Sequence, residues 1–148
     1  HAPMTEVPVW TLDTNVLVSG LLYPDGPPGR LVDAMLARQL RLALDDRIEK
    51  EYRTVLARPK FRFDPSDLAR VLGILSDQQH FTVTSSAGLV AAEPADTKFL
   101  EVASATAAKV LVTDNLKHYP RAGRGKVRVM APAEAIVELQ RSSDTPRI

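Results

Sequence analysis

Short apolar runs that alternate with helical patterns are the feature that most narrows the folds open to this chain. Residues 40–44 and 109–113 are apolar at nearly consecutive positions, which is typical of strands buried on both faces of a parallel sheet. Between such runs, apolar residues recur at the spacing of helices that cover a sheet. The pattern predicts a single α/β domain over residues 1–148, with three layers (α/β/α) and a central parallel sheet.

The individual elements follow from the same periodicities. Strands are expected at residues 7–12, 40–44, 81–84, 109–113 and 127–130. Helices are expected at residues 16–22 and about 31–38, after Asp45 or Asp46, after Asp64 with Pro65 in the first position, from 95–96 onward, and from Pro132. The proline- and glycine-rich stretch at 24–29 is expected to be a loop.

Composition excludes several classes of protein. The 148 residues are 45% hydrophobic, which suffices for one real core, and they include no cysteine, which excludes disulfides and thiolate metal sites. No apolar run reaches the length of a membrane span and no signal peptide is visible, so a cytoplasmic location is the default expectation. We expect residues 1–4 to be a cloning remnant or disordered, and residues 142–148 to be a disordered tail.

Four carboxylates are expected at one edge of the predicted sheet. Asp13 and Asp114 directly follow predicted strands, Glu51 lies on the helix after residues 40–44, and Asp96 opens the helix before residues 109–113. Open α/β sheets bind ligands at the carboxyl ends of their strands. Carboxylates gathered there repel one another unless a cation lies between them, and Mg²⁺ prefers such oxygen ligands. The sequence therefore predicts a magnesium site able to activate water against a phosphodiester.

Each of these residues also has a plainer interpretation. Asp13 and Asp96 could simply cap helices, Glu51 could be a solvated helix residue, and Asp114 with Asn115 could form a turn. The pairing of an acid after the first strand with an acid after a late strand favours a site over four unrelated roles.

Four segments resemble a known family. Residues 12–19, 51–61, 96–103 and 111–120 are similar, in order and spacing, to the four acidic segments of PIN domains, and the likeness runs from about residue 9 to 139. The subgroup that the chain most resembles contains VapC-type toxins of bacterial toxin–antitoxin pairs. The resemblance implies a Mg²⁺- or Mn²⁺-dependent endoribonuclease that cleaves single-stranded RNA.

The resemblance also assigns roles to residues. Asp13, Glu51 and Asp96 fall on the family's acidic positions. The fourth position departs from the pattern of threonine, any residue, then aspartate, which in the subgroup often ends in asparagine. Here the order is Thr113-Asp114-Asn115, so the acid comes one residue early. The expected catalytic residues are Asp13, Glu51, Asp96 and Asp114; the metal ligands among them are Asp13, Asp96 and Asp114. Supporting roles are expected for Thr14, Asn15, Thr113 and Asn115, and Glu93 is either an outer contact of the site or simply exposed.

Basic residues supply a candidate contact for RNA. The segment 117–128 follows the last predicted acid and contains basic residues but no acidic one, and a second basic cluster lies at 53–62. The expected RNA contacts are Lys117, His118, Arg121 and Arg124, with a solvated surface as the plainer interpretation. The resemblance further implies a separate antitoxin protein as partner and a homodimer formed through helices at the edge of the fold.

Two other functions stay open from the sequence. The displaced fourth acid is compatible with a non-catalytic PIN-like module that binds RNA or protein through a degenerate metal site. A phosphohydrolase that uses Asp13 as nucleophile would place a second acid two residues later, where Asn15 stands.

Overall fold

The computed structural model describes residues 7–144, without the side chains of 142–144. The expectations for residues 1–4 and 145–148 lie outside this range. Helix α6 (Pro132–Asp144) continues through residues 142–144, so the prediction of a disordered tail from Ser142 is wrong for these three positions. Within the described residues, no helix is long and apolar enough to cross a membrane.

A five-stranded parallel sheet forms the centre of the molecule, as predicted. Its strands are β1 (Val9–Leu12), β2 (Arg41–Leu44), β3 (Gln79–His80), β4 (Val110–Val112) and β5 (Arg128–Met130), in the spatial order β3-β2-β1-β4-β5. β1 lies in the middle, where Trp10 pairs with Leu42 on one side and Leu12 with Val112 on the other. The parallel arrangement brings the carboxyl ends of β1 and β4 together.

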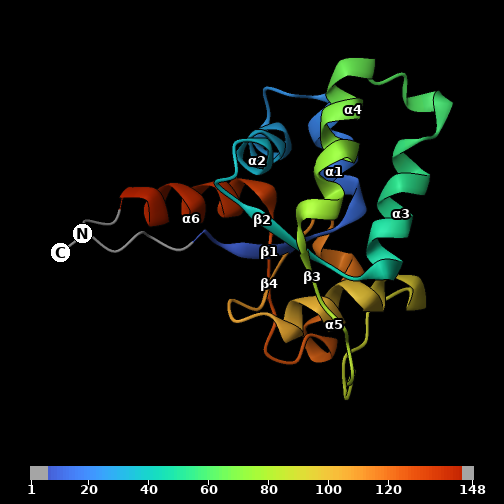
Figure 1. Cartoon of the computed structure of the whole chain (residues 1–148). Helices are drawn as coiled ribbons and strands as arrows, with labels where there is room; N and C mark the ends of the chain where they lie inside the picture. Colours follow the sequence, from blue (N-terminus) through green and yellow to red (C-terminus); the bar gives the residue numbers. More distant parts are fainter. Residues whose placement is uncertain (1–6, 145–148) are drawn as a thin grey trace.

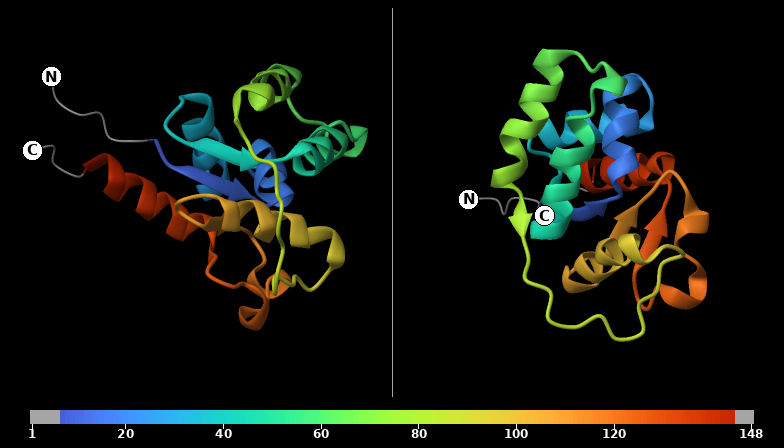
Figure 2. Two further views of the ribbon diagram at one scale, coloured as in Figure 1. Left: turned by 60° about the horizontal axis from the view of Figure 1, so that its bottom comes forward. Right: turned by 90° about the vertical axis from the view of Figure 1, so that its right-hand side faces the viewer.

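Helices cover both faces of the sheet and complete the three-layer α/β/α fold. The remaining helices are α1 (Thr14–Leu22), α2 (Pro27–Leu36), α3 (Asp46–Leu56), α4 (Pro65–Ile74) and α5 (Thr97–Ala105). The ribbon views place α5 on one side of the sheet and α1, α2 and α4 on the other (Figures 1 and 2). α3 contacts both α1 and α5, and therefore stands where the two helical layers meet.

Helix starts follow the local chemistry of the sequence. Asp13, Asp45 and Asp64 each cap a helix by accepting a backbone N–H in the first turn, of α1, α3 and α4 respectively. Pro65 takes the first helical position of α4, as predicted. Asp96 ends a short 3₁₀ turn, η3 (Pro94–Asp96), and precedes α5 without capping it through its side chain.

Two predicted boundaries are wrong. The strand expected at 81–84 is instead β3, two residues earlier, because Gln79 and His80 are the residues that pair with β2. The loop expected at 24–29 ends at Gly26, since Pro27 and Pro28 fit the first turn of α2, where no backbone N–H is needed.

The buried Gly29 of α2 marks a close approach between backbones. A Cβ at this position would lie 2.1 Å from the carbonyl oxygen of Pro24, whereas a Cβ at Gly73 in α4 would meet nothing within 4 Å. We expect Gly29→Ala to lower the free energy of unfolding by about 1–3 kcal/mol through overpacking. Gly73→Ala, the matched control, should raise it by up to about 1 kcal/mol through helix propensity. Urea denaturation of both variants measures the difference, and equal midpoints would contradict the expected clash.

Candidate active site

Asp13 lies at the carboxyl edge of the sheet, between its two central strands. Its backbone N–H donates to the carbonyl oxygen of Val112 at 2.9 Å, which joins the ends of β1 and β4. Its side chain is only 5% exposed. A carboxylate this deeply buried needs hydrogen-bond partners or a cation.

Two hydroxyl groups bind the same oxygen of that carboxylate. The Oδ2 atom of Asp13 accepts a hydrogen bond from the Tyr119 hydroxyl at 2.8 Å and one from Thr113 Oγ1 at 3.1 Å. Burial, followed by the charge of Asp13, raises the pKa of Tyr119 far above its ordinary value, so this phenol stays protonated and donates. The hydroxyls fix the orientation of Asp13, while its Oδ1 accepts the backbone N–H of Asn15 at 3.4 Å.

Asp96 and Asp114 are close enough to Asp13 to respond to its charge. Burial raises the pKa of Asp96 above its ordinary value, and the charges of Asp13 and Glu51 raise it further, against the opposing effect of Lys98. Desolvation and the charge of Asp13 likewise raise the pKa of Asp114, against the effect of a hydrogen bond from Ser19 Oγ. Mutual repulsion among carboxylates of this kind is relieved by a bound cation.

Glu51 already has two partners in the structure. It accepts a hydrogen bond from the Thr14 hydroxyl, and its Oε1 atom lies 2.8 Å from the ammonium of Lys98. Lys98 is held in turn by the carbonyl oxygen of Ala95 and lies over the ring of Phe99. The charge of Glu51 is thus neutralised by Lys98 of the same chain.

The fourth acidic segment separates the roles of Asp114 and Asn115. The Asn115 side chain accepts from the backbone N–H of Lys117 and contacts the His118 ring at 3.0 Å, so it caps the 3₁₀ turn η4 (Leu116–His118). Asp114 instead accepts a hydrogen bond from Ser19 at 2.9 Å. Only Asp114 of these two neighbours carries a charge, and the charge of Asp13 helps to raise its pKa.

The predicted basic contacts do not form one uniform surface. His118 lies near enough to lower the pKa of Asp96, whereas Arg124 donates to the carbonyl oxygen of Tyr119 and stabilises the loop after β4. Lys117 and Arg121 are exposed. Glu93 is also exposed, which matches the plainer of the two roles expected for it.

Three residues that bind the predicted acids were missed by the sequence analysis. Tyr119 contacts Asp13, Ser19 contacts Asp114, and Lys98 contacts Glu51. Tyr119 and Lys98 both lie inside the acidic segments, so a polar residue near a predicted acid was a signal available for them. Ser19 also lies inside an acidic segment, but the acid that it contacts, Asp114, is 95 positions away in another segment.

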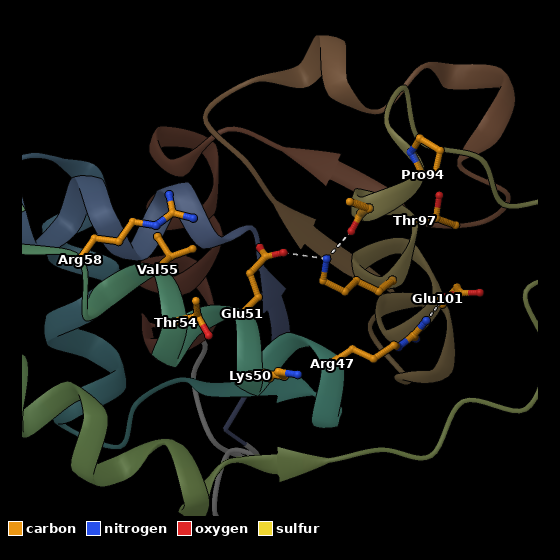
Figure 3. Close-up of a pocket in the computed structure, with 11 residues that line it drawn as sticks. Arg47, Lys50, Glu51, Thr54, Val55, Arg58, Pro94, Thr97 and Glu101 are labelled. Carbon is orange, nitrogen blue, oxygen red and sulfur yellow. Dashed lines mark hydrogen bonds and ion pairs between the residues drawn. The ribbon is translucent and has the colours of Figure 1, made fainter. Parts of the chain in front are cut away.

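An open cavity of about 870 Å³ adjoins the carboxylates between α3 and the start of α5 (Figure 3). Glu51 and Lys98 belong to its wall, so it is continuous with the acidic edge. Its lining residues are Arg47, Lys50, Glu51, Thr54, Val55, Arg58, Pro94, Ala95, Thr97, Lys98 and Glu101.

The carboxylate oxygens at this edge are the type of ligand that a hard divalent cation prefers. Asp13, Asp96 and Asp114 offer carboxylate oxygens that repel one another, and magnesium needs few protein ligands because it keeps several waters. In the described part of the chain, however, no three acidic or histidine side chains already stand in a metal-binding arrangement.

Comparison with known proteins yields one family. The model described as "PIN domain" matches residues 10–117, which include all four candidate carboxylates. No curated protein matches the chain.

Proposed function

The chain belongs to the PIN-domain family, whose members are generally nucleases that use divalent metal ions, and on this premise we propose that it is a Mg²⁺- or Mn²⁺-dependent endoribonuclease that cleaves single-stranded RNA. The observation that carries the proposal is the placement of Asp13 at the joined ends of β1 and β4, where two hydroxyl groups hold its buried carboxylate at the carboxyl edge of the sheet. A bound divalent ion would supply an activated water and stabilise charge on the phosphodiester oxygens.

The residues of the chain have distinct proposed roles. Asp13 and Asp96 hold the cation, with Asp114 as a third ligand. Tyr119 and Thr113 keep Asp13 oriented through their hydrogen bonds. His118, which contacts Asn115 at 3.0 Å in the loop after β4, is the proposed contact for a phosphate of the substrate.

Metal dependence tests the proposal directly. A labelled single-stranded RNA should be cleaved in Mn²⁺ or Mg²⁺ and stay intact in chelator. Asp13→Asn, purified in the same way, controls for a contaminating ribonuclease, since Asn fills the same space without the charge. Cleavage that persists in chelator, or that Asp13→Asn retains in full, would contradict the assignment.

A biological role as a toxin, restrained by a separate antitoxin, is the finer part of the proposal. It is supported by the likeness of the four acidic segments to the toxin subgroup. Exposed apolar side chains at the end of α1, Leu22 and Tyr23, are compatible with the proposed homodimer. Induction of the wild-type chain, but not of Asp13→Asn, should then arrest the growth of a bacterial host.

One observation favours a second candidate, the non-catalytic binding module. The Lys98 ammonium already neutralises Glu51, which leaves fewer free carboxylates for a cation. A calorimetric titration with Mn²⁺ separates the two candidates, because a degenerate site should bind the ion only weakly.

A further inference from the structure

The α3–α5 cavity has the dimensions of a ligand site. Its volume of about 870 Å³ lies within the range of about 300–1,000 Å³ typical of small-molecule sites. One wall is a single stripe of α3 and the residues just beyond it, and the other is η3 with the first turns of α5 (Figure 3). The stripe consists of Arg47, Lys50, Glu51, Thr54, Val55 and Arg58. At 1.5 Å per residue it is about 16 Å long from Arg47 to Arg58, and Glu51 of the acidic edge lies within it.

The charges of the cavity favour an anionic occupant. Arg47 is paired with Asp45 and Glu101 at 2.7 and 2.8 Å, and Lys98 is paired with Glu51. Lys50 and Arg58 are exposed and have no anionic partner among residues 7–141. Two unpaired cations therefore face a cavity whose anions are already neutralised.

The remaining lining is apolar or small. Val55 on the α3 wall and Pro94 and Ala95 on the η3 wall are the apolar part of the lining, called the apolar floor below, and Thr54 adds a methyl group. An apolar floor between separated cations suits a ligand that alternates phosphates with flat rings. A polynucleotide strand has this chemistry, and the connection to Glu51 would carry it to the carboxylate cluster.

We propose that the α3–α5 cavity is a nucleotide subsite for the RNA strand, with Lys50 and Arg58 binding its phosphates and the apolar floor receiving a base or ribose. The ligand identity rests on the proposed function, because the occupant is its substrate. This subsite is separate from the basic segment after β4, so the strand would contact the protein on more than one side of the scissile phosphate.

Binding in chelator tests the subsite without any turnover. The anisotropy of a fluorescent single-stranded RNA is measured against the wild-type chain, Lys50→Gln, Arg58→Gln and the double variant. Arg70→Gln is the matched control, since Arg70 is exposed on α4 and does not line the cavity. Each cavity variant should weaken binding on the order of fivefold, and the salt dependence of log K should fall by about 0.7 per side chain removed.

A third variant tests the cavity through the α3 stripe. Thr54→Glu adds a carboxylate to the middle of the stripe at an exposed position, and should weaken RNA binding at least as much as Lys50→Gln. Circular dichroism melting confirms that each variant is folded.

The outcomes distinguish the subsite from the nuclease. Cavity variants that bind RNA like Arg70→Gln, or a wild-type chain that binds no RNA, would overturn the subsite; the first result would leave a protein partner as the occupant. Loss of binding in the cavity variants supports it even if no metal ion produces cleavage, in which case the proposed nuclease activity alone fails.

Discussion

Asp96→Asn is expected to lower metal-dependent RNA cleavage by more than about 100-fold, because even an outer contact of a metal ligand typically contributes about 10–100-fold. Asp96 precedes α5 without capping it, and its carboxyl accepts no hydrogen bond from another described residue, so the substitution breaks no structural contact of that side chain. The loss should therefore appear in turnover and in Mn²⁺ affinity, not in folding.

The same variant should be more stable than the wild type near neutral pH. Burial and the charges of Asp13 and Glu51 raise the pKa of Asp96 in the folded state above its value in the unfolded chain. The folded state therefore binds the proton more tightly, and stability is lost as the pH rises through the folded pKa. Asp96→Asn removes this loss; because Asp96 is only half-buried, solvent screening limits the gain to about 1 kcal/mol.

The pH dependence of the gain provides the control. Urea denaturation in chelator should show the difference between variant and wild type at pH 7, and the difference should shrink as the pH falls toward the ordinary pKa of aspartate, about 4. Asp33→Asn, at an exposed position on α2, should show no comparable gain. A variant that is less stable than the wild type at pH 7 would contradict the charge repulsion assigned to Asp96.

Much of the fold was predictable because the deciding signals are local. β1 and β4 are short apolar runs with an acid one or two residues after them, and Asp45 and Asp64 occupy capping positions that their own neighbours define. The alternation of strands and helices then leaves few topologies, since parallel strands require crossovers. The positions of Asp13 and Asp114 at one edge follow from this topology.

The parts that failed depend on distant partners. β3 is only two residues long and owes its register to Ala43 and Leu44, so the apolar pattern of residues 81–84 could not locate it. The hydrogen bond from Tyr119 to Asp13 joins residues 106 positions apart. Likewise, the threonine–acid–asparagine order alone does not reveal that Asn115 caps η4 while Asp114 accepts a hydrogen bond from Ser19, 95 positions away.

Lys98→Met is expected to raise the affinity for Mn²⁺ on the order of tenfold, because it removes a positive charge beside the carboxylates that would bind the ion. Lys98 and Glu51 pair at 2.8 Å with side-chain exposures of 12% and 29%, so the ammonium is poorly screened by solvent. It also lowers the pKa of Asp96, which shows that its charge reaches a second acid. In effect the charge of the ammonium opposes the binding of a divalent ion at the neighbouring carboxylates.

The loss of that charge should also make folding depend more strongly on metal. Without Lys98, Glu51 keeps the Thr14 hydroxyl but loses its charged partner, which should cost about 1–3 kcal/mol of unfolding free energy in chelator. Added Mn²⁺ should restore it, because an ion that binds the folded state stabilises it by mass action. Calorimetry and thermal melts with and without Mn²⁺ measure both effects.

Lys126→Met, at an exposed lysine away from the acids, should change neither the affinity nor the stability. Adding Glu51→Gln to Lys98→Met should reverse most of the gain in affinity. A Lys98→Met chain that binds Mn²⁺ no more tightly than Lys126→Met would show that the charge of Lys98 does not act on the metal site.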